Sequence, residues 1–114
     1  MRFSVLLLLP LIGAIDAKKW HRCRCQRENH NGLVEDNAAL TQNVCAVSFS
    51  SSAEWRPGAG ECHAITGNLI DKNEFADECA KLAKSYQPIE DGLINYSAPP
   101  TSMDCERKCR VHCD

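Results

Sequence analysis

Apolar and polar positions alternate along residues 20–26, WHRCRCQ, so cysteines and arginines fall on opposite sides of an extended chain. A period of two is the period of a β-strand. We therefore predict a strand over residues 20–26, with Cys23 and Cys25 on one face and Arg22 and Arg24 on the other. The turn-forming sequence NHNG follows at residues 29–32.

The next apolar residues follow a helical period. Leu40, Val44 and Val47 are spaced by four and then three positions, which places them in one stripe along a helix. Asp36 precedes this stripe and can accept hydrogen bonds from the first turn of the helix. The pattern predicts a helix that is capped by Asp36 and runs to about Phe49.

A second helix is marked at its start and at its end. Asp71 is placed to cap it, and Glu74 three residues later completes a capping box. Ile70 and Phe75 flank the cap at the spacing of a hydrophobic staple, and Pro88 is expected to stop the helix. The predicted buried stripe consists of Phe75, Cys79, Leu82 and Tyr86.

The remaining segments predict strands and turns. Residues 61–70 favour a strand, residues 55–60 favour a loop, and residues 89–96 favour a short hairpin around Asp91-Gly92. The order is then strand, helix, strand, helix, strand, followed by a cysteine-rich tail. This order predicts a two-layer α+β domain, a short sheet with two helices on one face. A disulfide-rich irregular fold is the alternative.

Residues 1–17 have the pattern of a secretory signal peptide. One basic residue precedes an apolar run over residues 5–12, and small residues lead to Ala17. A membrane anchor is the alternative, but a spanning helix needs about 20 apolar residues, and this run is shorter and contains Pro10. We expect cleavage after Ala17, secretion, and one domain over residues 18–114.

Large apolar residues are few after residue 17, and cysteines are many. Only 20 of those 97 residues (114 minus 17) are large apolar or aromatic residues. An even number of cysteines in a short secreted chain predicts a disulfide framework that supports a thin core. The eight predicted participants are Cys23, Cys25, Cys45, Cys62, Cys79, Cys105, Cys109 and Cys113.

A metal site is the alternative explanation for Cys23-Arg24-Cys25. Zinc sites favour two cysteines with at least two residues between them and a second, matching pair, whereas one residue separates these two. The expected compartment is also oxidising. We therefore predict disulfides, with no metal ion and no cofactor.

The spacing of the cysteines restricts how they can pair. Cys105, Cys109 and Cys113 recur every fourth residue, so a C-terminal helix would stack them on one face, where they are poorly placed to bridge. A bond between Cys23 and Cys25 would be strained. If pairs within each cluster are forbidden, at least one of Cys23 and Cys25 must bond to the C-terminal cluster.

Charge is unevenly distributed along the chain. Residues 18–27 carry five bases and no acid, residues 28–106 carry thirteen acids and four bases, and residues 107–114 carry three bases and one acid. Brought together, the two basic ends would form one patch for an anionic partner. The interpretation that we favour is that they pair with the acidic middle of the protein or are solvated.

Aromatic and basic residues outside the predicted stripes are the candidates for binding a partner. They are Trp20, Arg22, Arg24 and Trp55. Trp55 has at least an equal claim to a place over the core. A separate candidate is Asn95, which begins the N-glycosylation sequon Asn95-Tyr96-Ser97 in a turn-prone region.

Catalysis is not favoured by the sequence. Serine-hydrolase, zinc-protease and phosphate-loop motifs do not occur, and the cysteines are committed to disulfides. The histidines could form an acid–base pair with Glu61 or Glu90, as in small secreted ribonucleases. They are His21, His30, His63 and His112. We expect no enzyme, and a small hydrolase is an alternative.

Three stretches together resemble a known class of proteins. They are KKWHRCRCQ, DNAALTQNVCAVSF, and CHAITGNLIDKNEFADEC, in which Phe75 lies four residues before Cys79. This architecture resembles the small secreted cysteine-rich proteins of plant-associated filamentous fungi, the class from which effectors are drawn. Some of these proteins are similar to fungal killer-toxin α/β folds. The tail with Cys105, Cys109 and Cys113 departs from the shorter members.

The resemblance implies a non-enzymatic virulence protein that acts on host plant defence in the apoplast or at the host–fungus interface. It implies a host protein or cell-surface component as the partner, and we expect a monomer with no membrane span and no nucleic-acid ligand. A toxin or antimicrobial protein against competitors is a second hypothesis. The net charge of −2 and the lack of a cationic amphipathic helix argue against it.

Overall fold

The computed structural model describes residues 19–114, and the predicted signal peptide, residues 1–17, lies outside the described residues. The described part is a small, disulfide-rich domain of mixed α and β structure with two helices and three sheets. The helices are α2 (Ala38–Ser48) and α3 (Lys72–Ala83). The strands are β1 (Lys19–Trp20), β2 (Arg22–Glu28), β3 (Val34–Asp36), β4 (Ala53–Arg56), β5 (Glu61–Ala64), β6 (Ile70–Asp71), β7 (Ile89–Glu90), β8 (Leu93–Ile94) and β9 (Lys108–Cys113).

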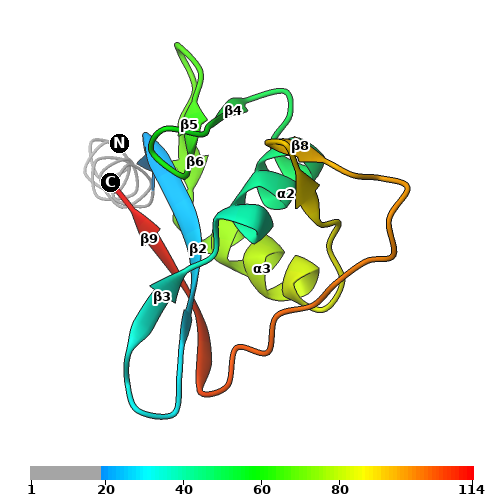
Figure 1. The fold of residues 1–114 in the computed structure, drawn as a ribbon. Coiled ribbons are helices and arrows are strands. Elements are labelled where there is room, and N and C mark those ends of the chain that lie inside the picture. The colour runs from blue at the N-terminus through cyan, green and yellow to red at the C-terminus, as the bar shows by residue number, and fades with distance from the viewer. Residues whose placement is uncertain (1–18) are drawn as a thin grey trace, which may run out of the picture.

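Strand β2 is the centre of the largest sheet (Figure 1). β9 runs antiparallel along one edge of β2, with Cys23 opposite Cys113 and Arg27 opposite Cys109. The other edge is shared, because β5 pairs with the beginning of β2 and β3 pairs with its end. β4 extends the sheet beyond β5. Segments from the beginning, middle and end of the chain therefore meet on one strand.

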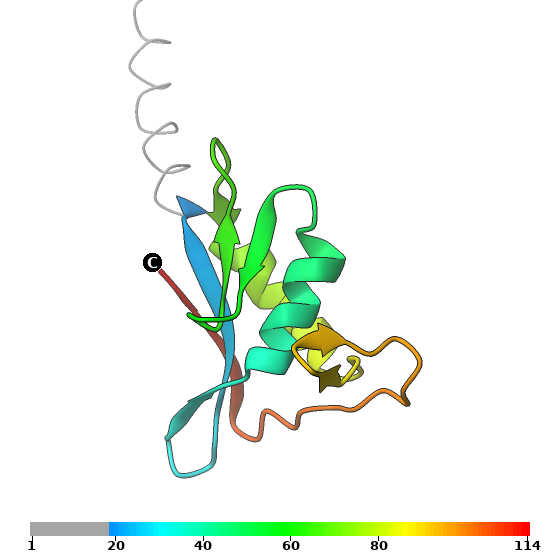
Figure 2. The ribbon, with the colours of Figure 1, turned by 45° about the horizontal axis from the view of Figure 1, so that its top comes forward.

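Alternation along β2 decides which face of the sheet carries the core. Cys23 and Cys25 are fully buried, while Arg22 is exposed on the opposite face, as predicted. Both helices contact the sheet, and Figures 1 and 2 show α2 and α3 on the same side of β2. Cys25 bonds to Cys79 of α3, so the helices lie on the cysteine face.

All eight cysteines form disulfides, as predicted, and they surround a small apolar core. Phe75, Leu40, Ile70 and Val44 are the largest fully buried apolar side chains. The bonds are Cys23–Cys113, Cys25–Cys79, Cys45–Cys62 and Cys105–Cys109. Three of them join different elements of the domain, so they hold the sheet and the helices around the core.

Helix α2 is capped by Asn37 and is enclosed on all sides in its middle. The Asn37 side chain accepts a hydrogen bond from the backbone of Leu40 at 2.9 Å. The prediction that Asp36 is the cap is wrong, because Asp36 ends β3 and accepts a hydrogen bond from Gln26. Every residue from 40 to 45 is buried, but Val47 is 58% exposed, because the last turn emerges from the packing.

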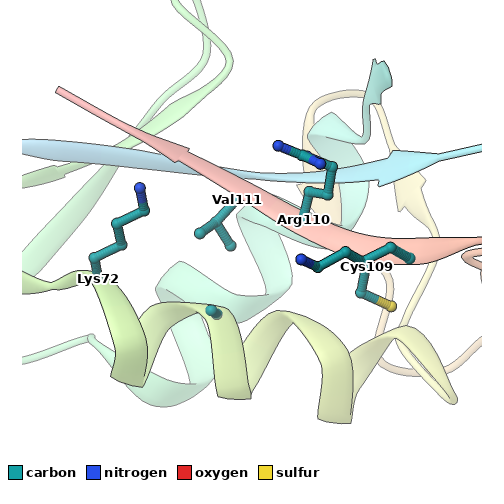
Figure 3. Close-up of a pocket in the computed structure, with 6 residues that line it drawn as sticks. Lys72, Cys109, Arg110 and Val111 are labelled. Carbon is teal, nitrogen blue, oxygen red and sulfur yellow. The ribbon is translucent and has the colours of Figure 1, made fainter. Parts of the chain in front are cut away.

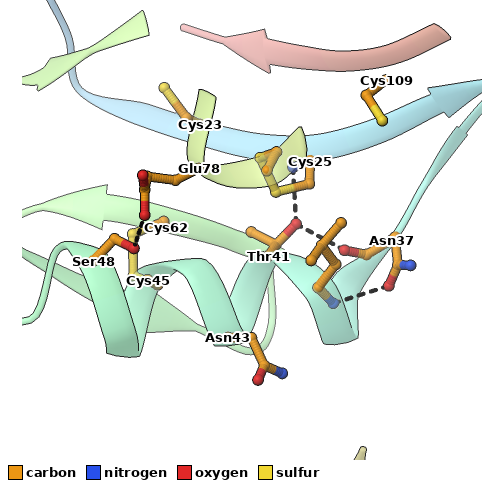
Figure 4. Close-up of a disulfide and its surroundings, with 12 residues drawn as sticks. Cys23, Cys25, Asn37, Thr41, Asn43, Cys45, Ser48, Cys62, Glu78 and Cys109 are labelled. Atoms are coloured by element: carbon orange, nitrogen blue, oxygen red, sulfur yellow. Dashed lines mark hydrogen bonds between the residues drawn. A yellow bond between two sulfur atoms is a disulfide. The ribbon is translucent and has the colours of Figure 1, made fainter. Parts of the chain in front are cut away.

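A buried hydroxyl links α2 to the central strand (Figure 4). Thr41 is fully buried, and its Oγ1 accepts a hydrogen bond from the backbone N–H of Cys25 at 2.9 Å. The same hydroxyl donates to the carbonyl of Asn37 at 2.8 Å. The buried backbone N–H of Cys25 therefore has a hydrogen-bond acceptor, although no residue of the described strands accepts from it.

Helix α3 begins as predicted. The Asp71 carboxylate accepts a hydrogen bond from the backbone of Glu74 at 3.1 Å, and both members of the staple, Ile70 and Phe75, are buried. The prediction that Pro88 stops the helix is wrong, since α3 ends at Ala83 and the chain turns before the proline.

The hairpin predicted over residues 89–96 is confirmed. β7 and β8 pair antiparallel, with Ile89 opposite Ile94. Asp91 and Gly92 have φ angles of +52° and +78°, the left-handed pair that a two-residue hairpin turn requires.

The other strand predictions need correction. The predicted strand over residues 61–70 is two short strands, β5 and β6, separated by a turn in which Gly67 has a φ of +88°. Trp55 and Arg56, predicted in a loop, belong to β4. Three strands precede α2, three lie between the helices and three follow α3, so the simple alternating order is too coarse.

Cys109 and Cys113 lie on strand β9 and Cys105 lies before the turn that leads into it, so the predicted C-terminal helix is wrong. Cys105 and Cys109 bond to each other across a tight turn, although we expected pairs within this cluster to be forbidden. Glu106 adopts a left-handed φ of +56°, and Lys108 donates a backbone hydrogen bond to Cys105. A turn brings the two cysteines together, which a continuous helix would not.

Candidate functional site: the charged face of the sheet

The face of the large sheet that points away from the cysteines carries charged side chains. Alternation along β2 places Arg22, Arg24 and Glu28 on this face. The register adds neighbours: His112 on β9 lies opposite Arg24, and His63 on β5 lies opposite Arg22. Basic and histidine residues from three segments therefore meet on one surface.

Arg24 is at the centre of this surface and is held by two carboxylates. Its Nε lies 3.2 Å from Asp36 Oδ1, and its Nη1 donates a hydrogen bond to Glu61 Oε2 at 3.3 Å. Glu61 is only 5% exposed. A carboxylate this buried needs a paired charge, and Arg24 provides it.

Glu28 occupies the corresponding place at the other end of β2. It forms ion pairs with two arginines near the C-terminus, at 3.2 Å from Arg107 and at 2.6 Å from Arg110, and Arg110 also donates a hydrogen bond to it. Its side chain is 12% exposed. Glu28 therefore joins the N-terminal strand to the C-terminal basic segment.

The remaining arginines of β2 are also paired. Arg27 lies 3.0 Å from Glu35 and 3.1 Å from Glu106, and Arg22 lies 3.7 Å from Asp114. The hydrogen bond to Glu35 raises the pKa of Arg27 above its usual value, and the charge of Glu106 acts in the same direction. The interpretation that the basic ends pair with the acidic middle is confirmed for Arg27, whereas Arg22 pairs with an acid of the C-terminal segment itself.

The structure brings together one of the predicted acid–base pairs. His63 Nε2 lies 3.4 Å from Glu61 Oε1. The buried Nε atom of Arg24 and Nε2 atom of His63 have no hydrogen-bond partner, although a carboxylate lies close to each. Glu61, His63 and Arg24 thus form a compact polar cluster, which we call the Glu61 cluster.

The other histidines lie apart from the Glu61 cluster or at its margin. His112 Nε2 lies 3.0 Å from Asp114 Oδ2, and His30 lies 4.0 Å from Glu106. His21 is exposed. Glu90 lies on the hairpin and accepts a hydrogen bond from Asn95, so it has no histidine contact among the described residues.

The two candidate tryptophans are half-buried against the core. Trp20 pairs with buried Ile70, and Trp55 lies opposite Cys62 on β4, on the cysteine face of the sheet. The arginines of the candidate set point from the other face. The set Trp20, Arg22, Arg24 and Trp55 therefore does not share one face of the sheet.

The glycosylation candidate lies in an ordered turn. Asn95 Oδ1 accepts backbone hydrogen bonds from Ser97 at 3.0 Å and Ala98 at 3.2 Å. Its Nδ2, the atom that would carry a glycan, donates to Glu90 at 2.9 Å at the surface.

A pocket of about 250 Å³ lies between α3 and β9 (Figure 3). Its lining includes three cations, Lys72, Lys108 and Arg110. The basic character of residues 107–114 was visible in the sequence, but Lys72 was not a candidate. Its place in the pocket depends on how α3 packs against β9, and no local pattern carries that information.

Comparison with known protein families identifies the family of the chain. The model of a family of unknown function, DUF5948, matches residues 20–87. The chain belongs to the DUF5948 family. The matched region runs from β1 past the end of α3. No curated protein and no solved structure matches the chain.

Two further properties of this DUF5948 protein concern ligands and membranes. Among residues 19–114, no group of three or more histidine, cysteine or acidic side chains is arranged to hold a metal ion. Neither described helix is long and apolar enough to cross a membrane.

Proposed function

We propose that this DUF5948 protein is a secreted, non-enzymatic effector of a plant-associated fungus. It acts on host plant defence in the apoplast or at the host–fungus interface, as a monomer that binds a host protein or cell-surface component. The observation that carries the proposal is the complete oxidation of its cysteines. All eight are paired, and no free cysteine lies among the described residues.

Complete pairing supports the extracellular part of the proposal. Disulfides form and persist in oxidising compartments, and small secreted domains use them where the core is thin. The signal-peptide pattern over residues 1–17 agrees with this interpretation. Cross-linked chains also expose fewer cleavable open states, which suits a protein that acts among host proteases.

The surface supports binding to a protein. Leu33 at the β2–β3 turn is 62% exposed, and Leu93 and Tyr96 around the β7–β8 hairpin are 72% and 70% exposed. The hairpin segment is held in place, since Gln87 Nε2 donates to the carbonyls of Asn95 and Ala98, each at 2.9 Å. Ordered loops with exposed aromatic and aliphatic side chains are typical of protein-binding surfaces.

The candidate set Trp20, Arg22, Arg24 and Trp55 remains part of the proposal. Arg22 is its most accessible member, with half of its side chain exposed and a single long ion pair. The arginines of the charged face already have acidic partners, so this face has little free positive charge to attract an anionic polymer. Its charges are better suited to pairing with individual charged groups of a protein. This supports a protein partner over nucleic acid.

The proposal includes the architecture of the scaffold. We propose a two-layer α+β arrangement similar to fungal killer-toxin folds, in which α2 and α3 form one layer over the sheet. The contacts of both helices with β2 support it. A high-resolution crystal structure of the secreted protein tests it.

Gene deletion in the producing organism tests the function. We expect the deletion strain to colonise its host less and to grow normally in culture, and the wild-type gene to restore colonisation. A gene encoding Leu93→Ser/Tyr96→Ser should restore it poorly. A gene encoding Lys81→Ser/Lys84→Ser, a matched change of two exposed residues at the C-terminal end of α3, should restore it fully. Normal colonisation by the deletion strain would contradict the proposal, and inhibition of competing microbes by the pure protein would favour a toxin.

A small hydrolase is the second candidate, and the Glu61 cluster favours it. A buried carboxylate 3.4 Å from a histidine and 3.3 Å from an arginine has the composition of an acid–base site for phosphodiester cleavage. Incubation of the pure protein with RNA tests this candidate. Cleavage that is lost in Glu61→Gln and kept in Glu54→Gln would support it, and a blank assay with the wild-type protein would remove it.

A further inference from the structure

We propose that the pocket between α3 and β9 binds a small ligand that carries a phosphate or sulfate group. This inference concerns a site away from the Glu61 cluster and the hairpin, and it stands independently of the effector proposal. We call the site the α3–β9 pocket. Its lining residues are Lys72, Ala76, Lys108, Cys109, Arg110 and Val111.

The walls of the pocket come from two rigid elements. Lys72 is the first residue of α3 and Ala76 lies one turn later, so both point from the same side of the helix. The opposite wall is the β9 strand, which is paired along β2 and anchored by the Cys23–Cys113 bond at its end. Figure 3 shows Lys72 rising from α3 toward the strand that carries Arg110 and Val111.

Unpaired positive charge is concentrated in this pocket. Every arginine of residues 19–114 lies within 4 Å of a carboxylate, as does Lys19. The lysines without an ion pair in this part of the chain are Lys72, Lys81, Lys84 and Lys108, and two of these four line the pocket.

The third cation is already paired with an acid on the charged face of the sheet. Arg110 is held by Glu28 at 2.6 Å, which fixes its position at the edge of the pocket. Two lysines without an ion pair thus line a space that has no acidic side chain among its lining residues, and lysine binds phosphate as a point charge.

The size and the floor of the pocket limit the ligand. A volume of about 250 Å³ is below the roughly 300–1,000 Å³ of sites for drug-sized molecules. Ala76 and Val111 provide an apolar surface beside the cations. A single phosphate or sulfate ester on one small ring, such as a sugar, matches these two properties.

Nuclear magnetic resonance titration of the disulfide-intact protein tests the proposal. Inorganic phosphate, glucose 6-phosphate and glucose 6-sulfate are added separately to uniformly ¹⁵N-labelled protein at constant ionic strength, with sodium chloride as the reference salt. We expect saturable shifts confined to the amides of Lys72, Ala76 and residues 108–111. A larger affinity for one ester identifies whether phosphate or sulfate is preferred.

Matched variants separate a specific site from general attraction. Lys72→Gln/Lys108→Gln should weaken binding at least tenfold, whereas Lys81→Gln/Lys84→Gln, with the same loss of two charges, should bind like the wild type. All four lysines are exposed, so folding is retained. The proposal is overturned if no probe saturates the site, or if both double variants lose binding equally.

Discussion

Cys23 and Cys113 face each other across β2 and β9, with their Cα atoms 4.1 Å apart and their sulfur atoms bonded. The adjacent pair, Arg22 and Asp114, exchanges two backbone hydrogen bonds. The cysteines therefore occupy a non-hydrogen-bonded site of the antiparallel pair, where facing residues are closest. This bond ties the first long strand to the end of the chain across 90 residues.

Removal of that bond should cost more stability than removal of the short C-terminal bond. In the Cys23→Ala/Cys113→Ala protein a closed loop of 90 residues is opened, and the gain in entropy of the unfolded chain should lower the free energy of unfolding by about 4–5 kcal/mol. The four-residue separation of Cys105 and Cys109 corresponds to a loss of about 2 kcal/mol. Urea denaturation of both double variants measures the difference. Equal losses, or a larger loss in the Cys105→Ala/Cys109→Ala protein, would contradict the role assigned to Cys23–Cys113.

Glu28→Gln should destabilise the domain by about 1–2 kcal/mol, because it removes the carboxylate shared by Arg107 and Arg110. The loss should shrink at about 1 M salt, which screens the interaction. Glu54→Gln is the control, since Glu54 pairs with Arg56 at an exposed site and should cost less than about 0.5 kcal/mol. Thermal or urea unfolding at low salt and at about 1 M salt measures the loss of stability of each of the two variants under both conditions.

Thr41→Val should cost about 1–3 kcal/mol although it keeps the volume of the side chain. The change leaves the backbone N–H of Cys25 buried without an acceptor. Thr101→Val at an exposed position is the control and should change the free energy of unfolding by less than about 0.5 kcal/mol. A neutral result for Thr41→Val would show that the link between α2 and β2 is not as described.

Asn95 should carry an N-linked glycan when the protein passes through a eukaryotic secretory pathway. The sequon lies in a surface turn, and glycosylation would replace the hydrogen bond from Asn95 Nδ2 to Glu90. Intact mass before and after enzymatic deglycosylation checks this, and Asn95→Gln should abolish the difference. An unchanged mass in the wild-type protein would disprove it.

Local patterns predicted the parts of the fold that short-range physics determines. The alternation around Cys23 and Cys25, the cap at Asp71 and the turn at Asp91-Gly92 are all present, because each depends on a few neighbouring residues. Predictions failed where a distant partner decides the outcome. The cysteine spacing of four suggested a helix at the C-terminus, but pairing with β2 makes this segment a strand.

The charged site could be predicted in composition but not in geometry. The basic ends and the acidic middle were visible, and charge favoured either their mutual pairing or their solvation. The individual partners could not be predicted. Glu28 and Arg110 are 82 residues apart in the sequence and meet only because β9 pairs with β2. Val47 shows the same limit within α2, because its exposure depends on how far the surrounding elements extend along the helix.

Disulfide mapping of the protein secreted by its own host tests the central claim most directly. Mass spectrometry without reduction should find no alkylated cysteine and a mass lower by eight hydrogen atoms, two for each of the four disulfides. Peptides containing Cys23 and Cys113 should be linked, as should those of Cys25 and Cys79. Free thiols in the secreted protein, or a Cys23 bonded to a residue other than Cys113, would contradict the account.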